Sequence, residues 1–163
     1  MGDEAAPTHD WSGTAPVRWT TTAPRERVWS VIEDGWTYAA WVVGASRVRS
    51  VDESWPAEGT QLHHSVGVWP LVRDDRTSVV EVDPAQMRIV LRARVRPFGT
   101  QLVEIEVSSQ PGGTMVTMRE DASGGLAALV PRPVRQAGLI IRNREALRRL
   151  CLLAERETHV EEV

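Results

Sequence analysis

Most of the chain between residues 43 and 121 consists of short segments in which apolar and polar residues alternate. Turn residues separate six such segments, at 43–52, 60–69, 76–83, 86–96, 101–109 and 114–121, and a seventh lies earlier, at 17–22. Alternation places the apolar side chains of a strand on one face, and this spacing is typical of an antiparallel meander. The pattern therefore predicts a wide antiparallel sheet of seven strands with one apolar face.

Helical patterns lie on both sides of the meander. Pro24 and Glu26 favour a helix start after the first strand, Asp34-Gly35 ends that helix, and a short second helix is expected over 36–41. A long amphipathic helix is expected over 134–157. Its apolar side carries Ile140, Asn143, Leu147, Leu150, Cys151 and Ala154. Its opposite side carries Arg142, Glu145, Arg149 and Arg156. A helix with one apolar side must pack on a sheet with one apolar face, which predicts an α+β fold.

Charged residues on the polar face predict how the strands pair. Plausible turn lengths bring opposite charges together across neighbouring strands, and such cross-strand pairs help to define the register. The expected pairs are Arg94 with Glu104, Arg92 with Glu106, Glu104 with Arg119 and Glu81 with Arg88. The inner face then consists of Ser78, Val80, Val82, Met87, Ile89, Leu91, Ala93, Val95, Val103, Ile105, Val107, Val116 and Met118.

Composition excludes several classes of function. The 163 residues predict one domain at 15–158, with a loose arm at 1–14 and a short tail at 159–163. A net charge of −3 argues against nucleic-acid binding, and no apolar run is long enough for stable membrane insertion. All 19 basic residues are Arg, so chemistry through a lysine Schiff base is excluded. One cysteine excludes a multi-cysteine zinc site, and the adjacent His63 and His64 point to opposite faces of a strand and cannot chelate one ion. We therefore expect no metal, no cofactor and a cytoplasmic location.

The order of the elements and several stretches of the sequence resemble those of a known superfamily. The matching stretches are TTAPRERVWSVIEDGWTYAAWVVGASRVRSVD, WPAEGTQLHHSVGVWPLVRDDRTSVVEVDP, QMRIVLRARVRPFGTQLVEIEV, TMVTMREDASGG and RNREALRRLCLLAER. They resemble the START/Bet v 1-like (SRPBCC) superfamily, in its polyketide cyclase/dehydrase-like branch. The resemblance covers nearly all of 16–157. It implies a helix-grip fold, in which the sheet curls around the C-terminal helix and leaves a cavity. Many members bind a hydrophobic small molecule there, and some are aromatases or cyclases.

Three polar residues are expected on the inner side of this fold. His64 lies on the inner face of the third strand, Glu120 continues the inner row of the seventh, and Asn143 lies on the inner side of the long helix. A histidine and a carboxylate in one apolar cavity can act as base and acid. The alternative is structural, with His64 hydrogen-bonded in the core and Glu120 at a strand end that contacts water.

Aromatic residues suggest a wall of the same cavity. Tyr38 and Trp41 lie on the short second helix and Trp69 lies near the third-strand hairpin. Amphipathic rings suit a pocket for a flat apolar ligand, although they also serve simply as a packing cluster. The full set of candidate ligand-binding residues is Tyr38, Trp41, His64, Trp69, Ser78, Leu91, Ala93, Ile105, Met118, Glu120, Asn143 and Leu147.

Three functional hypotheses remain open. The first is a binding or carrier protein, monomeric or homodimeric, for a lipid, polyketide or aromatic metabolite. The second is a cyclase or dehydratase in which His64 abstracts a proton, Glu120 donates or relays one, and Asn143 orients a carbonyl oxygen. The third is a structural or regulatory domain without a ligand. The first two differ in whether the polar residues only orient the ligand or form a positioned catalytic pair.

Overall fold

The computed structural model describes residues 9–67, 70–95, 99–123 and 129–161. In chain order the elements are β1 (Val17–Thr21), α1 (Arg25–Glu33), η1 (Gly35–Thr37), α2 (Tyr38–Trp41), β2 (Ala45–Val51), β3 (Gln61–Val66), β4 (Arg73–Asp83), β5 (Arg88–Val95), β6 (Gly99–Gln110), β7 (Gly113–Ser123) and α3 (Arg132–Glu161). Strands and helices follow each other in the predicted order. The short second helix is divided into a 3₁₀ turn and one α-helical turn, and the Asp34 side chain caps the start of the 3₁₀ turn by accepting from the backbone N–H of Trp36.

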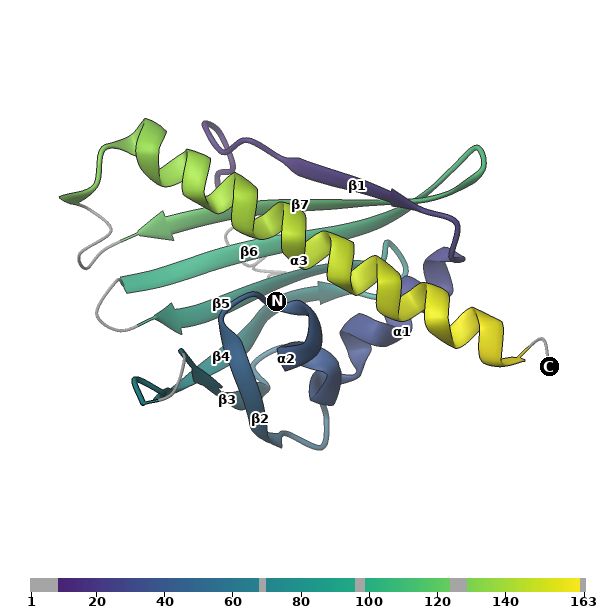
Figure 1. The fold of residues 1–163 in the computed structure, drawn as a ribbon, viewed down its shortest axis with the longest axis horizontal. Helices are drawn as coiled ribbons and strands as arrows, with labels where there is room; N and C mark the ends of the chain where they lie inside the picture. Colours follow the sequence, from purple (N-terminus) through teal and green to yellow (C-terminus); the bar gives the residue numbers. More distant parts are fainter. Residues whose placement is uncertain (1–8, 68–69, 96–98, 124–128, 162–163) are drawn as a thin grey trace, which may run out of the picture.

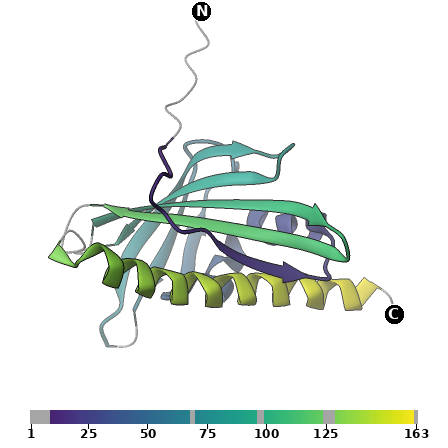
Figure 2. The same ribbon diagram turned by 90° about the horizontal axis from the view of Figure 1, so that it is seen from above.

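One antiparallel sheet contains all seven strands, in the order β1-β7-β6-β5-β4-β3-β2. Helix α3 runs diagonally across one face of this sheet, α2 lies between α3 and β2, and α1 packs beside α3 and contacts β6 and β7 (Figure 1). The view from above shows α3 lying along one side of the bent sheet (Figure 2). This arrangement is the helix-grip fold, as predicted.

The core lies between the sheet and α3. Ile89 and Ile105 from the sheet and Leu147 and Leu150 from the helix are fully buried. Cys151 is buried beside them, and burial raises the pKa of its thiol to about 12. The predicted apolar sides of β5, β6 and α3 are therefore confirmed for the residues whose side chains are described. Among the described residues, no helix has both the length and the hydropathy needed to cross a membrane.

The predicted register between β5 and β6 is wrong, although the faces are right. Arg92 lies opposite Leu102 rather than Glu106, and Arg94 lies opposite Thr100 rather than Glu104. Pairing continues as far as Val95 and Gly99, so the connection is shorter than the five residues that the prediction assumed. The displacement is four residues, an even number, and an even displacement leaves each side chain on its predicted face.

The other two predicted charge pairs form. Glu104 lies directly opposite Arg119, and their side chains are 2.6 Å apart. Arg88 reaches Glu81 at 2.5 Å, but from a diagonal position, because its direct neighbour on β4 is Asp83. Charge complementarity thus identified the partners but not every register.

A β-bulge in β4 overturns the predicted inner positions of Ser78 and Val80. The register with β5 shifts between Val79 and Glu81, and on the N-terminal side of this shift Thr77 and Val79 face inward and are buried. Ser78 instead lies opposite Arg92 on the outer face. A bulge adds one residue to one strand and so exchanges inner and outer positions beyond it. Val82, after the bulge, packs against the core as predicted.

Candidate functional site

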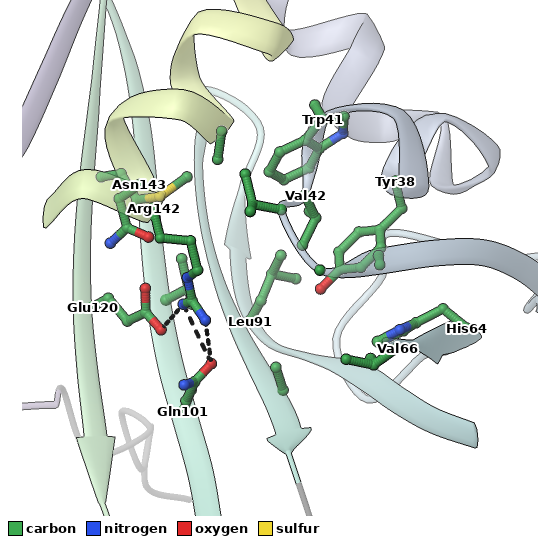
Figure 3. Close-up of a pocket in the computed structure, with 17 residues that line it drawn as sticks. Tyr38, Trp41, Val42, His64, Val66, Leu91, Gln101, Glu120, Arg142 and Asn143 are labelled. Carbon is green, nitrogen blue, oxygen red and sulfur yellow. Dashed lines mark hydrogen bonds and ion pairs between the residues drawn. The ribbon is translucent and has the colours of Figure 1, made fainter. Parts of the chain in front are cut away.

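A cavity of about 300 Å³ lies between α2, α3 and the inner face of the sheet (Figure 3). Apolar side chains form most of its wall, among them Trp41 from α2, Leu91 from β5 and Met118 from β7. Small residues leave the space, since Ala93 on β5 and Ala146 on α3 both line it. The volume is at the lower end of the range for small-molecule sites.

Eight of the predicted ligand-binding residues line this cavity: Tyr38, Trp41, His64, Leu91, Ala93, Met118, Glu120 and Asn143. Ile105 and Leu147 do not line it, because they are fully buried in the packed core. Ser78 is on the outer face, for the reason given above. Trp69 lies outside the described residues. A role in ligand binding stays a prediction for all of them.

His64 occupies one end of the cavity and is held by a polar pair. Its Nε2 lies 3.1 Å from the Thr77 hydroxyl, which in turn lies 2.9 Å from the Tyr38 hydroxyl. The Tyr38 and His64 rings are 5.0 Å apart. The bulge in β4 creates this arrangement, because it turns Thr77 inward between the two rings. The short sequence pattern gave no sign of Thr77 in this position.

Burial determines the charge state at this end. Burial lowers the pKa of His64 to about 4 and raises the pKa of Tyr38 to about 12, so both side chains are neutral near pH 7. A neutral imidazole has one N–H donor and one acceptor nitrogen. The Nδ1 atom of His64 is buried without a hydrogen-bond partner among the described residues.

Glu120 occupies the other end of the cavity and forms an ion pair with Arg142. The Arg142 guanidinium donates to Glu120 Oε1 and, at 3.4 Å, to the side-chain oxygen of Gln101 (Figure 3). The Arg142 side chain is 33% exposed, whereas that of Glu120 is 1% exposed. The second carboxylate oxygen, Oε2, is buried without a partner among the described residues. Asn143, also buried, lines the cavity beside them.

Arg142 corrects the sequence prediction, which placed it on the outer side of α3. It is next to Asn143 in the helix, at the flank of the apolar side, and its long stem carries the guanidinium to the sheet. Gln101 was missed as well, although it continues the inner alternation of β6. The other lining residues that were not predicted as ligand contacts are Val42, Val43, Gly44, Ala45, Val66, Val103 and Ala146.

The two polar ends are separated by apolar wall. His64 is on β3 and Glu120 is on β7, with β4, β5 and β6 between them. Figure 3 shows the same division, with Glu120 and Arg142 on one side of Leu91 and His64 and Tyr38 on the other. The cavity thus has polar groups at both of these places, and a role of His64 and Glu120 as a catalytic pair stays a prediction.

Solved structures with the same fold include two aromatase/cyclases. The ZhuI aromatase/cyclase from Streptomyces sp. R1128 is 19% identical, with a TM-score of 0.65 over 89% of this chain and 94% of that one. The di-domain aromatase/cyclase StfQ from the steffimycin biosynthetic pathway is 12% identical, with a TM-score of 0.70 over 90% of this chain and 51% of that one. Ara h 8.0201 is 12% identical, with a TM-score of 0.66 over 86% of this chain and 96% of that one. At these identities the likeness concerns the fold.

The family assignment rests on the sequence itself. Among proteins with curated descriptions, none matches the chain significantly. The sequence profile of a family described as "Polyketide cyclase / dehydrase and lipid transport" matches residues 14–155, which is most of the chain. The resemblance to the polyketide cyclase/dehydrase-like branch of the SRPBCC superfamily is therefore confirmed, and the chain belongs to the polyketide cyclase / dehydrase and lipid transport family.

Proposed function

We propose that this protein binds a hydrophobic small molecule, such as a lipid, polyketide or aromatic metabolite, in the cavity between the sheet and α3. The observation that supports this most directly is the cavity itself, which has about 300 Å³ of space and largely apolar walls. Apolar surface left unfilled in a protein interior costs free energy, and a ligand of matching shape recovers it. The family description, which includes lipid transport, agrees with this proposal.

A cyclase or dehydratase is the second candidate. The observation that favours it is His64, which is neutral near pH 7 and has a free Nδ1 that can accept a proton. The ion pair between Glu120 and Arg142 argues against the predicted acid–base pair, because the carboxylate is already engaged by the guanidinium. We therefore favour binding without catalysis.

A ligand screen tests the binding proposal. Trp41 lines the cavity, so a bound ligand should quench or shift tryptophan fluorescence and, by linkage, raise the melting temperature. The screen uses fatty acids, sterols and aromatic polyketides. Ala146→Phe should fill the cavity and weaken binding at least tenfold while the chain stays folded. If no compound produces either signal in the wild-type protein, the binding proposal is wrong and the structural hypothesis is favoured.

A second experiment separates binding from catalysis. His64→Ala should change the affinity for an apolar ligand by less than about tenfold if His64 only contributes a contact. The same substitution should lower turnover by about 100-fold or more if His64 is a catalytic base. Turnover is followed with a linear poly-β-ketone analogue and compared with the reaction in buffer. Wild-type turnover above the buffer rate, lost in His64→Ala, would establish the enzyme and overturn the carrier proposal.

A further inference from the structure

The Glu120 end of the cavity has an arginine, which would ordinarily suggest a site for a ligand carboxylate. Here the positive charge is already used, because Arg142 is ion-paired with Glu120. Among the residues that line the cavity, these two are the charged ones, and their charges cancel. His64, at the far end, adds no charge near pH 7. The cavity as a whole is therefore electrically neutral, although it contains a guanidinium.

Unsatisfied hydrogen-bonding capacity at this end is on the carboxylate, not on the arginine. Glu120 is 3% exposed, and its Oε2 has no partner among the described residues. A buried carboxylate oxygen without a donor is unfavourable, and a ligand that supplies a donor relieves this. Asn143 lies at the same end and offers an amide that can donate to, or accept from, the same ligand group (Figure 3). A hydroxyl group, which both donates and accepts, matches this pair.

We propose that the cavity selects neutral apolar ligands with an alcohol or phenol hydroxyl at the Glu120 end, and that it discriminates against ligands that carry a carboxylate; this rests on the proposed function. The hydroxyl donates to Glu120 Oε2, and its oxygen faces the Asn143 amide. A ligand carboxylate would place a second negative charge beside Glu120. It would also compete with Glu120 for Arg142, so that two carboxylates would share one guanidinium and leave a net negative charge in a buried site.

Three probes with one ring system test the proposal: naphthalene, 1-naphthol and 1-naphthoate. Calorimetric titration at pH 7 should show that 1-naphthol binds about fivefold more tightly than naphthalene, as expected for one hydrogen bond. The wild-type protein should bind 1-naphthoate at least tenfold more weakly than 1-naphthol. Tighter binding of 1-naphthoate than of 1-naphthol, or equal binding of all three probes, would overturn the selectivity while leaving the proposed function in place. Failure of all three, with a negative ligand screen, would remove both.

Glu120→Gln should invert the preference. It removes the negative charge and frees Arg142, so the affinity for 1-naphthoate should rise at least tenfold and that for 1-naphthol should fall. Glu104→Gln is the matched control, because Glu104 is equally buried and also paired with arginines but faces away from the cavity. It should leave the order of the three probes unchanged. An unchanged order in a folded Glu120→Gln variant contradicts the proposal.

Arg142→Gln provides an independent variant at a half-buried position, where folding is less at risk. It leaves Glu120 without its cation, so 1-naphthoate binding should weaken further while 1-naphthol still binds. Far-ultraviolet circular dichroism and a melting curve establish that each variant is folded before titration. If Arg142→Gln reduces binding of 1-naphthoate and 1-naphthol by the same factor, the charge argument is wrong.

Discussion

Two glutamates on neighbouring strands are buried to the same degree but differ in how they are partnered. Glu104 on β6 is 4% exposed and Glu120 on β7 is 3% exposed. Glu104 Oε1 accepts from Arg88 at 2.8 Å and its Oε2 accepts from Arg119 at 2.6 Å, so both oxygens are satisfied. Glu120 has one oxygen paired with Arg142 and one without a partner among the described residues.

The difference in partnering distinguishes an ion-pair cluster that supports the fold from a glutamate that lines the cavity. On the outer face, the Glu104 cluster of Arg88, Arg119 and Glu81 provides each charge with an opposite charge and fixes strand pairing. On the inner face, the incomplete hydrogen bonding of Glu120 and of His64 coincides with the cavity. A folded protein satisfies nearly all buried polar groups. Three residues that line the cavity, Trp41, His64 and Glu120, each have a buried side-chain N or O atom without a partner among the described residues, which agrees with the ligand site proposed above. Four predictions follow this comparison, in order of expected size.

The largest effect should come from His64 at acid pH. Its folded-state pKa of about 4 lies below the 6.5 of an exposed imidazole, so between these values the unfolded chain binds more protons. Its contribution to stability is therefore complete above pH 6.5 and is lost as the pH falls to 4, amounting to about 3 kcal/mol. Urea unfolding measures how much the free energy of unfolding falls between pH 7 and pH 4. This fall should be smaller in His64→Gln than in the wild-type protein, by about the same amount. Equal losses in the two would mean that His64 is not held neutral.

Glu104→Gln should destabilise the fold by about 2 kcal/mol, because it weakens two charge-assisted hydrogen bonds at a buried position. Denaturant unfolding at pH 7 measures this free energy. The loss should diminish in 1 M salt only slightly, since a buried cluster is poorly screened. A loss in unfolding free energy below about 0.5 kcal/mol would mean that the Glu104 cluster stabilises the fold no more than ordinary surface ion pairs do.

Glu120→Gln should cost less than about 1 kcal/mol in the absence of ligand. One ion pair is weakened, but an unsatisfied charged oxygen is removed at the same time. The free energy of unfolding is measured beside that of Glu104→Gln in the same buffer. If the two substitutions cost the same, the contrast between the two glutamates does not hold.

Arg94→Ala should have the smallest effect, under about 0.5 kcal/mol, because this side chain is exposed and lies opposite Thr100 rather than Glu104. It serves as the baseline for the outer face. A loss comparable to that of Glu104→Gln would show that stabilising charge interactions extend along the whole of β5.

The architecture was predictable because alternation and amphipathicity act over many residues. One displaced register, such as that of β5 and β6, changes no face when the displacement is even. The polar contacts of the site were harder to predict from the sequence. The inward positions of His64, Glu120 and Asn143 follow from the alternation of the strands and the periodicity of the helix, and all three line the cavity. Thr77, in contrast, faces inward because of a bulge in the pairing of β4 with β5.

Long side chains were the second source of error. Strand alternation and helix periodicity predict the direction in which each Cβ points. The guanidinium of Arg142 lies several bonds beyond its Cβ and can reach across to the sheet. Arg88 similarly reaches Glu81 from a diagonal position. Ile105 and Leu147 face the cavity side of the fold as expected, yet neighbouring side chains cover them. Their separation from the cavity depends on volumes in three dimensions, which no one-dimensional pattern contains.

The buried thiol of Cys151 in α3 can be used to measure local opening of the protein core. Cys151 is the sole cysteine of the sequence and is buried in the core, with its pKa raised to about 12 by burial. Thiol reagents attack the thiolate, so modification requires the core around this part of α3 to open first. The labelling rate of the unaltered chain therefore reports how readily this opening occurs. Comparing that rate with and without a bound molecule would show whether binding suppresses the opening, with no introduced probe.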